Sequence, residues 1–297
     1  MGTPQAECLP FKDLVLGEDQ GPVLRPVDIL LVHSRVGWPD WLLPWRWWRL
    51  GSLFIRWATR GEFNHAALVF LTRRASEGYH HTFVMESTIG GGVDILPIQR
   101  YLCNPRAVVA IKRVKAPWFH RLDTQEQARG ERWSRYERRA RGLALEQIQD
   151  AYDHRLLFRL GSRLLGGLLL ATLMAWRRLF WPGNGPPPMA VRRQGKGVKG
   201  LPSGRDASAY ICSGLVAAAL FRAVEEVDRD RPEAVRVCHL QDVVFLPHPP
   251  SSFADLLSST PVHLAVRDNL AWLYLVVDGR VHTVNTYEEV RRLAGWR

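Results

Sequence analysis

The stretch YICSGLV, residues 210–216, places a cysteine and a serine directly before an apolar, alanine-rich run. Apolar residues recur at helical spacing between residues 214 and 224, which predicts a helix with one buried face. Cys212 would lie in its first turn, where unpaired backbone N–H groups and the positive end of the helix dipole favour a thiolate. The same N–H groups can stabilise an oxyanion during acyl transfer. Cys212 is thus the candidate nucleophile, and the alternative is an inert core thiol, because free cysteine is often buried.

A cysteine nucleophile needs a base, and a predicted hairpin upstream supplies a candidate. NHAALVF (residues 64–70) and HTFVMEST (residues 81–88) both have strand composition and are joined by a polar connection. A turn centred near Ser76 makes His65 and Glu86 cross-strand neighbours, so that the carboxylate can fix the tautomer of the histidine and stabilise its imidazolium. The alternative for His65 is an ordinary core histidine. A register slip of one residue would place the two side chains on opposite faces.

Composition bounds the class of protein and its partners. The chain has 297 residues, of which 46% are apolar, so it can bury a substantial core. A net charge of +11 together with 12 tryptophans suits a partner that carries phosphates. Peripheral contact with a membrane fits better than nucleic acid, because the aromatic residues lie among apolar residues and not on alternating basic strands. No secretory signal is visible at the start of the sequence.

Cysteine usage gives an expectation about the compartment. The four cysteines show neither paired spacing nor a metal-binding pattern: Cys8, Cys103, Cys212 and Cys238. This favours reduced thiols over a disulfide framework, and a cytoplasmic location, peripheral at the membrane. We expect neither a metal nor a cofactor.

Two segments suggest contact with lipid. Residues 37–63 mix tryptophan and arginine, as an interfacial segment does when indole rings sit at headgroup level and guanidinium groups pair with phosphates. The alternative is a helix with a Trp-rich core face. Residues 156–181 contain a run without charge, from 164 to 176, that is too short to span a bilayer. It fits a lid, a membrane anchor or a core helix, and the sequence leaves these three open.

The remaining pattern predicts one α+β domain with an insertion. Strands are expected at residues 26–33 and 107–114, and a hairpin across Asp278 and Gly279. The glycines before DILPIQRYL indicate a tight backbone turn that leads into a short helix. We divide the chain into an irregular leader (residues 1–24), a main domain (residues 25–262) and a C-terminal hairpin with a short helix packed on the same domain (residues 263–297). The main domain contains an insertion at about residues 154–207.

Five short motifs together resemble the NlpC/P60 superfamily of papain-like cysteine peptidases. VDILLVH resembles its opening strand, FNHAALVF its histidine strand, VMEST the strand with the polar third residue, DAYDHRLLF the tyrosine-aspartate segment and YICSGLV the nucleophile motif. The cysteine comes last here, as in the circularly permuted branch with the YiiX-like and lecithin retinol acyltransferase-like proteins. The resemblance covers residues from about 27 to about 260.

The resemblance implies a permuted papain-like fold, in which the cysteine helix packs against an antiparallel sheet and an apolar helix is inserted. It implies Cys212 as nucleophile, His65 as general base and Glu86 as the orienting residue. The substrate would contact residues in the flanking motifs, namely Tyr210, Ser213 and Tyr152.

Three positions depart from the family pattern and concern substrate contacts more than the chemistry. Gly214 stands where permuted members often carry glutamate, Ile211 where the unpermuted family has aspartate, and Asp150 where a glycine is common. The insertion between Asp153 and Ser208 is also long for the family.

These patterns lead to a hypothesis of cysteine-dependent hydrolysis or acyl transfer through a thioester. The substrate would be an amide or ester. The Trp-rich segment (residues 37–63) and the apolar segment (residues 156–181) point to a lipid or an acylated molecule at a membrane surface. Two alternatives stay open. One is a peptide amidase or endopeptidase of the NlpC/P60 type, and the other is a catalytically idle membrane-binding adaptor module.

Overall fold

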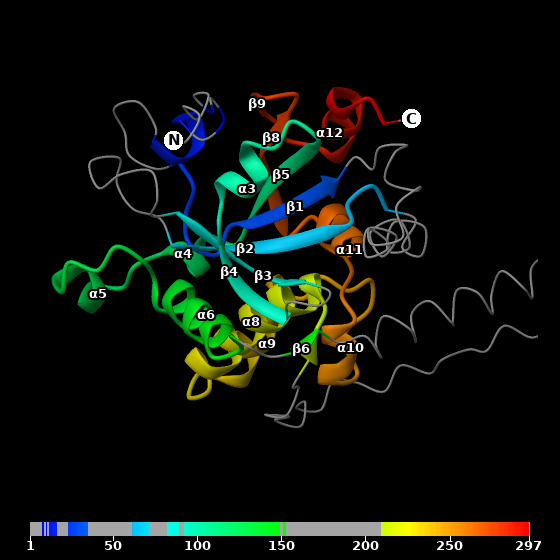
Figure 1. Ribbon diagram of the computed structural model, residues 1–297. Coiled ribbons are helices and arrows are strands. Elements are labelled where there is room, and N and C mark those ends of the chain that lie inside the picture. The colour runs from blue at the N-terminus through cyan, green and yellow to red at the C-terminus, as the bar shows by residue number, and fades with distance from the viewer. Residues whose placement is uncertain are drawn as a thin grey trace, which may run out of the picture.

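The fold is built around a seven-stranded antiparallel sheet in the order β4-β3-β2-β1-β5-β8-β9 (Figure 1). The computed structural model describes residues 8, 10, 12–16, 23–34, 61–71, 82–88, 92–148, 151–152 and 209–296. The strands of this sheet are β1 (Ile29–Ser34), β2 (His65–Leu71), β3 (Phe83–Thr88), β4 (Gly92–Pro97), β5 (Ala107–Val114), β8 (Leu270–Val277) and β9 (Arg280–Thr283). Helices pack against this sheet, so the expected α+β class is confirmed.

Strand β1 lies in the middle of the sheet because its sequence, ILLVHS, can be buried on both faces. Successive side chains of a strand point to opposite faces. Ile29 and Leu31 therefore join the core on one side of the sheet, and Leu30 and Val32 join the core on the other side. The sheet thus separates two hydrophobic cores.

Helix α8 (Cys212–Val227) fills the first core and confirms the predicted helix. Most of its 16 residues are buried, which explains the run of alanine and leucine in its sequence. Helices α6 (Arg135–Leu145) and α9 (Glu233–Asp242) gather with it on one side of the sheet (Figure 1). Shorter helices complete the described fold: α4 (Pro117–His120), α5 (Thr124–Ala128), α10 (Phe253–Leu257), α11 (Pro261–Val266) and α12 (Tyr287–Ala294).

The N-terminal segment covers part of the second core. A short helical turn, η1 (Lys12–Leu16), buries Leu14 and Val15 there, together with Leu24. The helix α3 (Gln99–Leu102) contributes Leu102 to the same core. Leu14, Val15 and Leu24 therefore share one hydrophobic cluster with α3, although they are far apart from it in the sequence.

Turn residues in the sequence predicted the C-terminal hairpin correctly but did not predict strand β4. The segment expected to be a tight turn before a helix contains the edge strand β4, and only its first residue, Gly92, has a positive φ, of 70°. Val93 is its one buried side chain, so the alternation typical of a strand is weak. The hairpin between β8 and β9 is confirmed, with positive φ at both Asp278 and Gly279.

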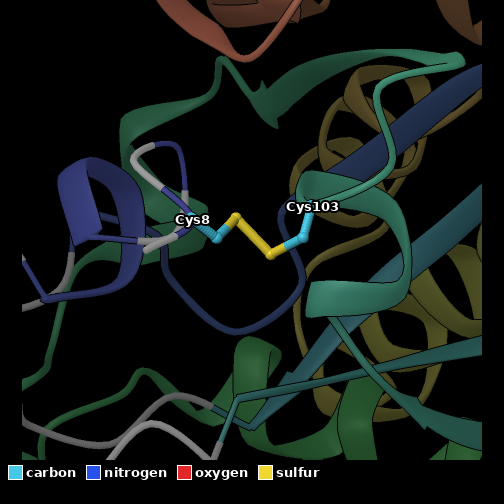
Figure 2. Close-up of a disulfide and its surroundings, with 2 residues drawn as sticks. All are labelled: Cys8 and Cys103. Carbon is cyan, nitrogen blue, oxygen red and sulfur yellow. A yellow bond between two sulfur atoms is a disulfide. The ribbon is translucent and has the colours of Figure 1, made fainter. Parts of the chain in front are cut away.

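A disulfide joins Cys8 to Cys103, with 5.5 Å between their Cα atoms (Figure 2). This corrects the expectation of reduced thiols for these two residues. The two cysteines are 95 residues apart, so no local spacing could reveal the pair. Cys212 and Cys238 are free. The sequence-based argument for a reducing, cytoplasmic compartment therefore does not hold.

The two segments expected to contact lipid lie almost entirely outside the described residues: 37–60 of the first and all of 156–181. Among the helices of the described ranges, none combines the length and the apolar character needed to span a bilayer. The two-residue strands β6 (Ala151–Tyr152) and β7 (Ala209–Tyr210) pair in parallel and form a separate small sheet.

Candidate active site

Cys212 is the first residue of α8 and follows the N-cap Ile211, which has extended backbone angles. The side chain of Ile211 does not cap this helix end. Its backbone N–H groups are therefore available to a negative charge, and the helix dipole favours such a charge at this position. The thiol is buried. Cys212 thus lies where the sequence predicts it, in a setting that favours a thiolate.

His65 and Glu86 are in contact, as predicted, but through a different register. Nε2 of His65 lies 2.6 Å from Oε2 of Glu86. The residue directly opposite Glu86 is Ala67, because β2 and β3 pair two residues away from the expected register, with a bulge between Val69 and Leu71. A shift by two residues keeps both side chains on the same face of the sheet, where they meet diagonally.

The thiol of Cys212 connects to this pair at the end of the β2–β3 ladder. Among the described residues, the ladder extends toward His65 only as far as Ala67 and Glu86. The His65 ring and the backbone N–H groups of Ala66 and Ser213 lie close enough to the thiol to lower its pKa. Since Nε2 of His65 faces Glu86, Nδ1 is the ring nitrogen left for the thiol. The three side chains therefore lie in the order thiol, imidazole, carboxylate, with a hydrogen bond between the imidazole and the carboxylate.

Tyr101 is a member of this cluster that sequence reasoning missed. Its hydroxyl donates a hydrogen bond to Oε2 of Glu86, the same oxygen that contacts His65. Its ring also stacks on the imidazole of His65, with 6.0 Å between the ring centroids and an interplanar angle of 27°. The residue belongs to the four-residue helix α3, and no spacing in the sequence connects that helix to β2 or β3.

The electrostatics of the cluster favour a charged pair of thiolate and imidazolium. Burial alone would raise the pKa of Cys212, but the neighbouring His65 charge and the hydrogen bonds to the thiol lower it. Burial likewise opposes protonation of His65, but the charges of Glu86 and Cys212 outweigh it and raise its pKa to about 10. Burial also opposes ionisation of Glu86, and here the His65 charge, with hydrogen bonds from His65 and Tyr101, lowers the pKa.

The two tyrosines expected to contact the substrate are placed by their backbones only. Tyr152 of β6 is the register partner of Tyr210 of β7, which precedes Cys212 by two residues. The parallel pair therefore brings the tyrosine-aspartate segment to the chain that enters α8. The side chains of both tyrosines lie outside the described part of the structure.

Ser213 makes a structural contact at the start of α8, and its expected contact with the substrate stays a prediction. Its side chain is fully buried, and its hydroxyl donates to the carbonyl oxygen of Ser259 at 2.5 Å. Next to it, Gly214 has no room for a larger residue, because a Cβ there would lie 2.3 Å from the carbonyl oxygen of Leu257. The two residues after Cys212 therefore fix the start of α8 against the end of α10 and the segment that follows it.

The arrangement has the groups that nucleophilic acyl transfer requires: a thiol with a lowered pKa, an adjacent imidazole, a carboxylate in contact with the imidazole and a helix N-terminus. No family model matches the sequence, and no curated protein matches it. The chemistry proposed below therefore depends on the geometry of Cys212, His65 and Glu86.

Proposed function

We propose that the protein is a cysteine-dependent hydrolase or acyltransferase that forms a thioester on Cys212. The observation that supports this most directly is the position of Cys212 at the N-terminus of α8 beside His65, which hydrogen bonds with Glu86. A buried structural thiol would be expected to stay protonated, whereas the surroundings of Cys212 lower its pKa.

The proposed reaction begins with the thiolate of Cys212 attacking the carbonyl carbon of an amide or ester. The carbonyl oxygen takes up the negative charge and accepts hydrogen bonds at the N-terminus of α8, where the N–H of Cys212 is the candidate donor. The imidazolium of His65 then gives its proton to the leaving amine or alcohol as the carbon–heteroatom bond breaks. In the second half, His65 takes a proton from water or an acceptor hydroxyl or amine, which attacks the thioester and releases Cys212.

A permuted papain-like fold is part of this proposal. It is supported by the packing of α8 against β2 and β3 of an antiparallel sheet, and by the position of the histidine strand before the cysteine helix. The parallel pair of Tyr152 and Tyr210 is consistent with the place of the tyrosine-aspartate motif beside the nucleophile motif.

For the substrate we propose an amide or ester of a lipid or acylated molecule. The net charge of +11 suits an anionic surface. A peptide amide is the alternative, and comparison of an acyl ester with a peptide amide of the same acyl group distinguishes the two.

Alkylation of Cys212 by iodoacetamide across pH tests the proposal without a known substrate. The exposed free thiol of Cys238 would also react, so the measurements use a Cys238→Ser background. We expect Cys212 to react at pH 6, where an ordinary thiol is almost fully protonated, and to lose this reactivity in His65→Ala. A Cys212 that reacts no faster than a free thiol, with a profile unchanged in His65→Ala, would contradict the proposal and favour an idle binding module.

Mass spectrometry provides a second test of the covalent step. Incubation with a short-chain p-nitrophenyl ester should add one acyl group to Cys212, and Cys212→Ala should remain unmodified. In His65→Ala the acyl group should form more slowly and should persist longer once formed, because both acylation and deacylation need the base.

A further inference from the structure

The carboxylate of Glu86 depends on very few hydrogen bonds. It is fully buried, and its Oε2 contacts both His65 and Tyr101. In the described part of the chain, its Oε1 has no hydrogen-bond partner. A buried carboxylate is costly unless it is well paired. The hydroxyl of Tyr101 is therefore one of only two donors that the described structure gives to Glu86.

Tyr101 is suited to this role by its own surroundings. Burial and the nearby carboxylate of Glu86 raise the pKa of the phenol, so that it remains a donor throughout the physiological range. Its ring stacks against His65, and this contact does not depend on the hydroxyl. The hydroxyl of Tyr101 thus contacts Glu86, and its ring contacts His65.

The helix that carries Tyr101 needs an external anchor. Helix α3 has four residues, and its N-cap Ile98 makes no side-chain cap. Such a short helix is not stable by itself. Its C-cap is Cys103, two residues after Tyr101, and the disulfide from this residue ties it to Cys8. Figure 2 shows the bridge between the N-terminal segment and the end of α3.

We propose that Tyr101 is the positioning residue for Glu86 and that the Cys8–Cys103 disulfide holds Tyr101 in place, so that reduction of this disulfide weakens the activation of Cys212. The inference rests on the proposed function of Cys212. In the reduction step, a dithiol gives two electrons and two protons to the sulfurs of Cys8 and Cys103. The S–S bond breaks, two thiols form, and the dithiol becomes a disulfide.

The expected effect has a defined direction in pH. Loss of a donor destabilises the ionised form of a carboxylate, so removal of the Tyr101 hydroxyl should raise the pKa of Glu86. A protonated Glu86 cannot stabilise the imidazolium of His65. The low-pH limb of Cys212 reactivity should therefore move to higher pH, while reactivity at alkaline pH, where the thiol ionises without help, should stay the same. Other charged or titratable groups near Glu86 are unchanged by the substitution: His65 on β2, Arg100 on α3, Asp94 on β4 and Cys212 on α8.

The first experiment compares Tyr101→Phe with Tyr136→Phe, both in the full chain with Cys238→Ser. Tyr136 is a matched control because its hydroxyl also donates to a buried carboxylate, that of Asp228, at 2.7 Å. Asp228 caps the far end of α8, about 24 Å from Cys212 at 1.5 Å per helical residue. We expect the low-pH limb of iodoacetamide alkylation to move up by about one pH unit in Tyr101→Phe, which is a tenfold loss at a fixed pH on that limb. Tyr136→Phe should leave the profile in place.

The second experiment links the tyrosine to the disulfide through a double-mutant cycle. Cys8→Ser with Cys103→Ser imitates the reduced protein without adding reactive thiols, and we expect it to shift the limb in the same direction as Tyr101→Phe. When the three substitutions are combined, the shift should be no larger than that of Tyr101→Phe alone, because the serine pair acts through the same hydroxyl. Circular dichroism at each pH shows whether the variants remain folded, so that a shift of the limb can be separated from partial unfolding.

Each outcome gives a decision. An activated Cys212 whose limb does not move in Tyr101→Phe overturns the positioning role, and additive shifts in the triple variant overturn the link to the disulfide. Both results leave the proposed function intact. A Cys212 that is unactivated in the unsubstituted protein is a failure of the proposed function, and the inference fails with it.

Discussion

Nε2 of His65 lies 2.6 Å from Oε2 of Glu86, and the Glu86 side chain has no exposed surface. The carboxylate thereby opposes the effect of burial on His65, whose pKa is raised to about 10. In Glu86→Gln this charge is lost, and burial then lowers the pKa of His65. Neutral imidazole cannot stabilise the thiolate of Cys212.

We therefore predict that Glu86→Gln lowers the alkylation rate of Cys212 at pH 6 by at least about tenfold, which corresponds to one unit of pKa. The two proteins should approach the same rate at alkaline pH, where the thiol ionises without the imidazolium. Rates of iodoacetamide incorporation in the Cys238→Ser background measure this. An equal rate at pH 6 would show that Glu86 has no influence on the thiol.

The pair of His65 and Cys212 predicts how the stability of the folded protein depends on pH. A raised pKa in folded His65 gives stability that is complete below the ordinary value of 6.5 and is lost as pH rises through about 10. A lowered pKa in folded Cys212 gives stability that is complete above its ordinary value of 9.0 and is lost as pH falls. Between 6.5 and 9.0 the two slopes cancel, because folded and unfolded proteins hold the same number of protons on the pair.

Above pH 9.0 only the loss from His65 remains, so the contribution of the pair should fall until about pH 10. We expect the difference in free energy of unfolding between the unsubstituted protein and the double variant His65→Gln with Cys212→Ser, in which neither member of the pair titrates, to be flat from pH 7 to 9 and to decrease from 9 to 10. Urea unfolding at each pH gives this difference, and other titrating groups cancel in it. A steady slope from pH 7 upward would mean that the thiol of Cys212 is protonated in the folded protein.

Gly214 is predicted to be essential for the placement of Cys212. A Cβ at this position would lie 2.3 Å from the carbonyl oxygen of Leu257, and a backbone atom cannot move away as a side chain can. Gly214→Ala should lower the free energy of unfolding by about 1–3 kcal/mol. Gly142→Ala in α6 is the matched control, because its nearest neighbour is the end of the Arg139 side chain at 3.7 Å. The control should be neutral or stabilising by roughly 0.5–1 kcal/mol, since alanine favours a helix. Thermal melts of both variants measure this difference in stability, and equal melting temperatures would contradict the prediction for Gly214.

How much of this site could be predicted from the sequence depends on whether each contact is local. The helical periodicity after Cys212 is local, and it placed the thiol in the first turn of α8 correctly. The contact of His65 with Glu86 was predicted despite a register error, because an error of two residues leaves a side chain on the same face. An error of one residue would have destroyed the prediction.

The parts that could not be predicted are contacts between distant segments. Tyr101 on α3 reaches Glu86 on β3, and Cys8 reaches Cys103 across 95 residues. The contact of the Ser213 hydroxyl with the carbonyl oxygen of Ser259, 46 residues away, was likewise not predicted. A motif shows which residues are neighbours in sequence, but it does not show which of them face the core.

Lys112 is predicted to hold the end of α11 against the sheet. This fully buried lysine of β5 donates through Nζ to the carbonyl oxygens of Leu264, Ala265 and Arg267, at 2.9, 2.6 and 3.2 Å. The ammonium group also lies 4.2 Å from the centroid of the Trp272 ring.

Substitution by methionine keeps most of the volume of Lys112 but removes the donor from three carbonyl groups at once. Because buried acceptors without a partner are costly, Lys112→Met should lower the free energy of unfolding by roughly 2–4 kcal/mol. Lys115→Met is the control: Lys115 follows the same strand and is exposed, so its substitution should change stability by less than about 0.5 kcal/mol. Urea unfolding of the two variants measures the difference. Equal stabilities would contradict this role of Lys112 and would mean that the apolar contacts of α11 hold it against the sheet.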